Sequence, residues 1–178
     1  MDRFLKQFSL GDGYYGQNYI WKKGVDDRLF TRGHGWVLEG LLSCIRATGE
    51  ENYKKEAKKL IENLMEIQKP DGSFSYLMGY GRPKKEELEG SGICEKTTAI
   101  LGYLFLEYNR IQPDPAVKLA GERALAWCES HMWREADPGF GGIWSASLSS
   151  GITRLPYLKV ATGYANAYYI LGKLLESR

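Results

Sequence analysis

A short glycine-flanked stretch, Thr31-Arg32-Gly33-His34-Gly35-Trp36, contains three side chains suited to ligand binding. A guanidinium pairs with carboxylates, an imidazole binds or transfers protons, and an indole stacks on flat apolar faces. The apolar residues of Val37–Ile45 follow at helical spacing, which predicts that the stretch lies at a helix N-terminus, where anionic ligands are favoured. We therefore predict that Arg32, His34 and Trp36 bind an acidic or hydroxyl-rich ligand, and that His34 is accessible.

Each of these residues also has an ordinary structural interpretation. Arg32 could form a salt bridge with a neighbouring loop, and His34 could simply belong to the start of the helix. Trp36 fits core packing as well as it fits a platform for a sugar ring. The sequence leaves these alternatives open.

Two carboxylates stand out because each lies in the first turns of an otherwise apolar helical segment. Burial of Glu39 or Glu95 would need a compensating partner or a function. If the two converge, they are candidates for the general acid and base of glycoside hydrolysis, with their separation setting the stereochemical outcome. The alternative is structural ion pairing with Arg32, Lys96 or Lys159.

A later loop supplies three candidate wall residues of the same site, Trp144, Tyr157 and Lys159. The pair Asp26-Asp27 is a rival source of a catalytic acid.

Metal-ligand spacing and a nucleophile triad are missing from the sequence. A GxGxxG match that begins at Gly11 is preceded by no predicted strand. We expect no metal and no cofactor.

The composition is typical of one globular domain covering residues 1–178, with an N-terminal loop segment over 1–30. Of the 178 residues, 43% are hydrophobic and 26% are charged. The net charge of +2 contains no basic block, which argues against a nucleic-acid partner. Three widely spaced cysteines predict reduced, buried thiols, and no stretch resembles a signal or a membrane span, so we expect a cytoplasmic protein without a membrane partner.

The apolar patterns predict helices of two kinds. Inner helices are apolar nearly all round, whereas outer helices have one apolar stripe and a charged face. We expect inner helices over 34–48, 91–110 and 156–176, and outer helices over 50–68 and 116–132. The first helix is expected to end at a left-handed Gly49, and Asp114-Pro115 is expected to cap the second outer helix.

The same order of features recurs along the chain. Gly40 and Gly102 are 62 residues apart, and the turns at Asp71 and Asp137 are 66 residues apart. An inner helix alternating with an outer helix at this period predicts an all-α fold of about two and a half helical hairpins, forming part of an α/α toroid. A four-helix bundle is the competing fold. It does not explain the long aromatic loops that precede the inner helices.

Three motifs resemble the six-hairpin glycosidases, most closely their unsaturated uronyl or rhamnogalacturonyl hydrolase type. They are Arg32-Gly33-His34-Gly35-Trp36, Gln68-Lys69-Pro70-Asp71-Gly72-Ser73-Phe74 and Glu89-Gly90-Ser91-Gly92, and the resemblance covers about residues 30–175. In that family the first motif shapes the sugar pocket. The resemblance therefore implies that Arg32 contacts a substrate carboxylate or hydroxyl and that Trp36 stacks on the ring.

The resemblance implies a glycoside hydrolase that acts on oligosaccharides containing uronic acid. A full toroid of this kind has about six hairpins, and the family's catalytic aspartates lie in the earlier ones, so none is carried over to this chain. We expect the C-terminal part of such an enzyme, or a toroid completed by another chain or another copy. The alternative function is a non-catalytic helical-repeat module that binds a partner or self-associates. A third alternative, a prenyl-type toroid, is ranked last because the sequence lacks the Asp-rich diphosphate motif that such chemistry needs.

Overall fold

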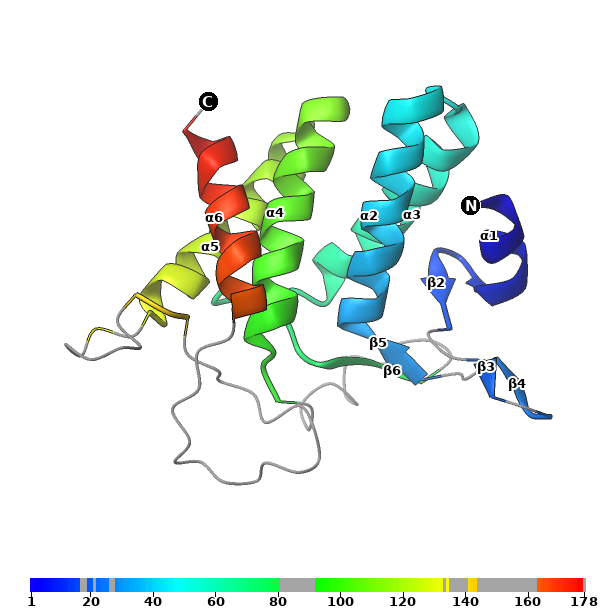
Figure 1. Cartoon of the computed structure of the whole chain (residues 1–178), viewed down its shortest axis with the longest axis horizontal. Helices are drawn as coiled ribbons and strands as arrows, with labels where there is room; N and C mark the ends of the chain where they lie inside the picture. The colour runs from blue at the N-terminus through cyan, green and yellow to red at the C-terminus, as the bar shows by residue number, and fades with distance from the viewer. Residues whose placement is uncertain are drawn as a thin grey trace. The chain divides into compact units, whose positions relative to one another are not determined.

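The structure, a computed structural model, describes residues 1–16, 19–20, 22–25, 28–80, 92–132, 134, 141–143 and 163–177. Within these residues, the helices are α1 (Asp2–Phe8), α2 (Thr31–Thr48), α3 (Glu51–Glu66), α4 (Glu95–Ile111), α5 (Pro115–Ser130) and α6 (Gly163–Glu176) (Figure 1). The strands are β1 (Ser9–Gly11), β2 (Tyr14–Tyr15), β3 (Tyr19–Ile20), β4 (Gly24–Val25), β5 (Arg28–Phe30) and β6 (Leu77–Tyr80). They pair antiparallel as β1–β2, β3–β4 and β5–β6. The predicted all-α class is confirmed.

The described chain forms two compact units. Unit 1 contains residues 1–67 and 77–80, and unit 2 contains residues 68–76 together with the described residues from 92 onward. Unit 1 is built on the hairpin of α2 and α3. Unit 2 is built on α4, α5 and α6.

Helix α2 begins three residues earlier than the sequence predicts, so the whole Arg32 to Trp36 stretch lies inside its first two turns. It ends at Gly49, whose φ of 71° is left-handed, as predicted. Helix α3 is a typical outer helix. Its buried stripe is Tyr53, Ala57, Leu60, Ile61 and Leu64. Lysines and glutamates occupy its exposed face.

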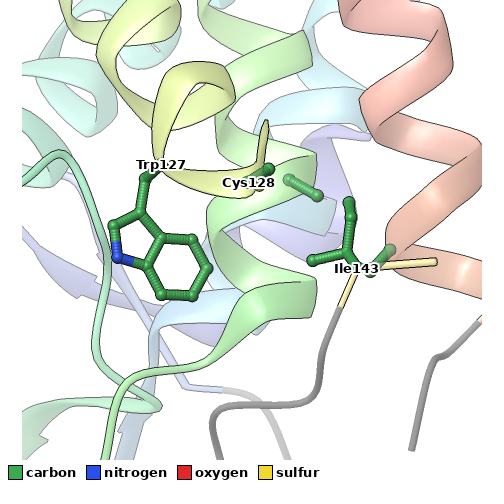
Figure 2. Packing of buried hydrophobic residues seen from close by; sticks show 5 residues of the cluster. Trp127, Cys128 and Ile143 are labelled. Carbon is green, nitrogen blue, oxygen red and sulfur yellow. The ribbon is translucent and has the colours of Figure 1, made fainter. Parts of the chain in front are cut away.

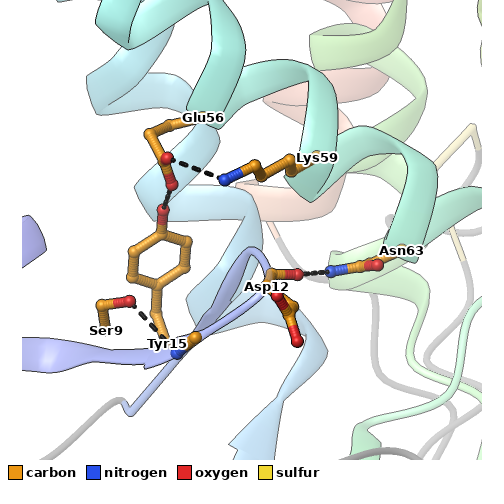
Figure 3. Close-up of polar contacts among 7 residues, drawn as sticks. Ser9, Asp12, Tyr15, Glu56, Lys59 and Asn63 are labelled. Carbon is orange, nitrogen blue, oxygen red and sulfur yellow. Dashed lines mark hydrogen bonds and ion pairs between the residues drawn. The ribbon is translucent and has the colours of Figure 1, made fainter.

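The N-terminal segment forms α1 and the first strands, and it bonds to α3. Asn63 Nδ2 donates to the carbonyl of Asp12 at 2.7 Å (Figure 3). The hydroxyl of Tyr15 donates to Glu56 Oε2 at 2.8 Å, and Lys59 Nζ pairs with the other oxygen of Glu56 at 3.3 Å. Burial, together with the carboxylate of Glu56, raises the pKa of Tyr15. These contacts hold β2 against the α2–α3 hairpin.

Helix α4 is buried nearly all round, as predicted for an inner helix. Helix α5 begins at the predicted cap. The carboxylate of Asp114 accepts hydrogen bonds from the backbone N–H groups of Ala116 and Val117, and Pro115 occupies the first helical position. A buried cluster joins α4, α5 and α6 (Figure 2). Its members are Ala99, Trp127, Cys128, Ile143 and Ala165.

Helix α6 differs from the inner helix that the sequence predicts, because only Ala165 and Gly172 are buried. Its apolar positions face two ways. One side packs on α4 and α5, while the other leaves Ile170 56% exposed and Leu174 53% exposed. Tyr164 and Leu171 are exposed as well.

The segment from Gln68 to Phe74 has a structural role in unit 2. Gln68 Nε2 donates to the carbonyls of Gly72, at 3.0 Å, and Ala120, at 2.9 Å. Arg123 donates to the carbonyls of Lys69 and Pro70 at 3.1 and 2.7 Å. The segment is therefore fastened to α5 by hydrogen bonds between side chains and backbone.

Asp71 and Gly72 fix the conformation of the turn itself. Oδ1 of Asp71 accepts from the backbone N–H and the hydroxyl of Ser73 at 2.9 and 2.7 Å. Burial acts to raise the pKa of Asp71, but the hydrogen bonds from Ser73, the charge of Lys69 and a hydrogen bond from Trp127 together outweigh it and lower that pKa. Gly72 has a φ of +93° and lies against the backbone of Arg123. Phe74 is fully buried with its ring 6.1 Å from that of Phe105.

Candidate functional site

Arg32 and Trp36 form the exposed part of the predicted site. They are four residues apart on α2, so their side chains lie on the same face. The guanidinium carbon lies 5.2 Å from the centre of the Trp36 ring, within the range of a cation–π contact. Trp36 is 43% exposed, so the core-packing interpretation does not hold for it. A cation and an aromatic surface are thus presented together.

Two polar atoms at the start of α2 lack a hydrogen-bond partner within the part of the chain that the structure describes. Arg32 Nε and Thr31 Oγ1 are buried atoms without a hydrogen-bond partner among the described residues. Among the residues that the structure describes, no carboxylate lies within ion-pair distance of Arg32. Helix α2 has neither a side-chain cap nor an acidic residue in its first turn. A cation at the positive end of a helix dipole is unfavourable unless an anion accompanies it. The first turn of α2 therefore suits an anionic ligand.

A pocket of about 280 Å³ adjoins this pair in unit 1. Its walls come from α1, β2 and α2, and the lining residues are Met1, Phe4, Tyr15, Gly16, Gly33, Trp36 and Val37. The volume is close to the lower end of the range of about 300–1,000 Å³ for small-molecule sites. Trp36 belongs both to this pocket and to the contact with Arg32. The pocket and the cationic pair are therefore continuous.

His34 is not accessible, which corrects the prediction from its glycine neighbours. It is 1% exposed because it points away from the Arg32 face and under β2. Its Nδ1 lies 2.9 Å from the carbonyl of Phe30, to which it donates, so Nε2 accepts the backbone N–H of Tyr15 at 3.1 Å. Both nitrogens are used, and the ring fastens β2 to the start of α2. In this arrangement His34 positions the pocket wall.

The burial of His34 predicts acid sensitivity. Burial lowers its pKa from 6.5 to about 4, against the opposing effect of the Phe30 hydrogen bond. Between these two pH values the unfolded chain binds a proton that the folded chain does not. The free energy of unfolding should therefore fall by about 3 kcal/mol as the pH decreases from 6.5 to 4. Urea unfolding across this range measures the effect.

Two variants isolate the contribution of His34. His34→Gln should lose this part of the pH dependence, whereas His131→Asn, which removes the chain's other imidazole, should keep it. A constant difference in unfolding free energy between the wild type and His34→Gln at all pH values would contradict the prediction.

The two candidate carboxylates have different surroundings. Glu39 is half-buried on α2, one turn after Trp36. Glu95 is 0% exposed in the first turn of α4, and Lys96 Nζ lies 3.1 Å from its Oε1. This ion pair supports the structural alternative for Glu95. Because Glu39 belongs to unit 1 and Glu95 to unit 2, their convergence stays a prediction.

Several predicted positions lie outside the described residues. They are Trp144, Tyr157, Lys159 and the pair Asp26-Asp27. Among the residues that the structure does describe, no group of three His, Cys, Asp or Glu side chains could hold a metal ion. In the same residues, no helix is long and apolar enough to cross a membrane.

Sequence reasoning missed two residues of the site. Phe4 and Tyr15 contribute pocket walls. The tyrosines and glycines of residues 11–16 were a signal for Tyr15, since such residues in a short segment are typical of ordered loops. Nothing local to Phe4 distinguishes a pocket wall from the apolar face of a short helix.

Comparison with solved structures identifies the architecture. The chain is similar to an unsaturated glucuronyl hydrolase from Bacillus sp. GL1, with a TM-score of 0.74 and 19% identity over 99% of this chain and 50% of that one. A possible member of the GH105 family from Salmonella enterica gives a TM-score of 0.72 at 14% identity, covering 98% of this chain and 48% of the other. A GH76 α-mannanase from Bacteroides thetaiotaomicron gives 0.64 at 16%, covering 92% and 45%.

These similarities establish the fold. The chain has the helical-hairpin architecture of the six-hairpin glycosidase toroids, as the motifs predicted. It spans about half the length of the solved chains that it matches. Neither a protein-family model nor a curated protein sequence matches it.

Proposed function

We propose that this chain is a carbohydrate-binding part of an α/α-toroid glycoside hydrolase that acts on oligosaccharides containing uronic acid. The observation that carries the proposal is the pairing of Arg32 with the exposed Trp36 at the start of α2. The similarity of the fold to unsaturated glucuronyl hydrolases supports it.

The chemistry of the pair matches a uronic acid. The guanidinium offers parallel N–H donors to a carboxylate, and the helix N-terminus adds a favourable dipole. The indole face of Trp36 can stack on the apolar face of a sugar ring. A neutral hexose would use the ring contact and lose the charge-assisted one.

We also propose Glu39 and Glu95 as the candidate catalytic carboxylates of this hydrolase. Of the two, Glu39 is closer in sequence to the Arg32–Trp36 pair and only half-buried, which favours its access to a bound sugar. The ion pair of Glu95 with Lys96 favours a structural role for Glu95. Trp144, Tyr157 and Lys159 remain proposed wall residues.

Calorimetric titration of this chain with matched uronate and neutral oligosaccharides tests the proposal. We expect the uronate ligands to bind and the neutral ligands to bind more weakly. Binding of neither class, or equal binding of both, would overturn it.

The exposed side of α6 indicates that a binding partner covers this helix. We infer that a second copy of the chain packs on this side, which is one of the ways in which the toroid is expected to be completed. Support comes from the exposure of Ile170 and Leu174, and from the chain's spanning about half of the solved toroids that it resembles. Burial of these side chains would supply the hydrophobic driving force for association.

Substitution of Leu174 by aspartate should disrupt this association. A charge at the centre of an apolar contact is costly to bury, so Leu174→Asp should raise the dimer dissociation constant at least tenfold, or about 1.4 kcal/mol. Leu119→Asp is the matched control, because Leu119 is equally exposed but lies alone on α5. Sedimentation velocity measures both. A wild-type chain that stays monomeric at high concentration would contradict the inference.

A further inference from the structure

We propose that the pocket beside Trp36 binds an aryl-sized apolar group attached to the bound uronic acid, as in an aryl uronoside. The inference rests on the proposed function, since it names the class of substituent that the same site accepts. Four features of the pocket in unit 1 support it.

The first feature is the character of the walls. The side chains that line the pocket are those of Met1, Phe4, Tyr15, Trp36 and Val37, and none of these side chains is charged. Phe4 and Tyr15 form one aromatic wall, with ring centres 6.3 Å apart, and Phe8 stacks on Phe4 at 4.9 Å. Trp36 contributes another wall. Such walls gain by removing apolar surface from water.

The second feature is the use of the polar atoms of Tyr15 by the protein itself. Its hydroxyl donates to Glu56, and its backbone N–H donates to His34. Tyr15 therefore presents its ring to the pocket without a spare N–H or O–H donor. A hydroxyl-rich sugar residue placed there would exchange hydrogen bonds with water for apolar contacts, which is unfavourable. An aryl group carries no such cost.

The third feature is size. An apolar protein cavity of about 150 Å³ is large enough to bind benzene. The pocket here holds about 280 Å³, which accommodates a single substituted ring and leaves little room for a chain of sugars.

The fourth feature is continuity with the anion-binding pair. Trp36 lines the pocket and also lies 5.2 Å from the guanidinium carbon of Arg32. A ligand with its carboxylate on Arg32 and its ring against Trp36 would have its substituent directed along the same helix face. One molecule can then occupy both places, with the charge on Arg32 and the apolar group between α1, β2 and α2.

The test compares methyl glucuronide, phenyl glucuronide and phenyl glucoside by calorimetry on the whole chain. We expect phenyl glucuronide to bind at least tenfold more tightly than methyl glucuronide, and phenyl glucoside to bind more weakly than phenyl glucuronide. Phe4→Ala should weaken the binding of phenyl glucuronide by a much larger factor than that of methyl glucuronide, so that most of the gain from the phenyl group is lost. Leu10→Ala is the matched control, because Leu10 is an exposed apolar residue of the same segment that does not line the pocket.

The outcomes separate this inference from the function on which it rests. Equal affinities for methyl and phenyl glucuronide would overturn the aryl pocket and leave uronate binding intact. Absence of binding by every glucuronide would overturn the proposed function itself. If Phe4→Ala unfolds by circular dichroism, Phe4→Leu keeps an apolar side chain in α1, and the ratio of the two wild-type affinities still decides the question.

Discussion

Replacement of Arg32 by glutamine is expected to weaken the binding of a uronate oligosaccharide by about 100-fold. Arg32 is the cation in the first turn of α2, and no acidic residue shares that turn. A hydrogen bond to a charged group contributes about 1.5–3 kcal/mol, so loss of a bidentate pair reaches about two orders of magnitude in affinity. Arg32→Gln keeps a polar side chain of similar reach, so the loss reports the charge.

Two further variants check this interpretation. Arg32→Lys keeps the charge but loses the planar fork and the stacking on Trp36, so we expect about a tenfold loss. Arg46→Gln removes an exposed arginine from the last turn of the same helix and should leave affinity unchanged. Equal losses for Arg32→Gln and Arg46→Gln would indicate only a general effect of net charge.

Replacement of Gly72 by alanine should cost about 4 kcal/mol of folding free energy. With φ at +93°, a side chain at this position is strained by about 1–3 kcal/mol. An added Cβ would also lie 2.4 Å from the carbonyl oxygen of Arg123, and such overpacking costs about 1–3 kcal/mol. The neighbour is backbone that Arg123 and Gln68 fasten to the turn, so it cannot move aside cheaply. Denaturant unfolding measures the loss.

The control for this variant is Gly49→Ala. Gly49 is also left-handed, with a φ of +71°, but an added Cβ there would meet nothing within 4 Å. Only the conformational cost of about 1 kcal/mol then applies. Equal destabilisation by the two substitutions would show that the contact with α5 contributes nothing, contrary to the structural role assigned to this turn.

Much of the fold was predictable because its signals are local. Gly49 and the Asp114-Pro115 pair marked helix ends correctly, since capping depends on residues next to one another. The apolar stripe of α3 is also a local pattern. The exposure of Leu174 on α6 was not predictable in the same way. Periodicity shows that a face is apolar, but not whether another element packs on it.

The candidate site was predictable in part. Arg32 and Trp36 were predicted to share a site at a helix N-terminus, and the structure has them in contact one turn apart. His34 between two glycines gave no sign that β2 would cover it, because that contact joins residues 19 positions apart. Phe4 and Tyr15 reach the pocket through similarly distant packing. Local chemistry can be inferred from local sequence, whereas burial depends on the folded chain.

The most direct test of the account is the preference for a carboxylate at Arg32. A glucuronate disaccharide and its carboxyl-reduced analogue differ only in that group, and calorimetry gives the dissociation constant of each for the wild type and for Arg32→Gln. We predict that the wild type prefers the glucuronate by at least tenfold and that Arg32→Gln has no preference. An equal preference in both proteins would contradict the account, because the carboxylate would then be recognised elsewhere.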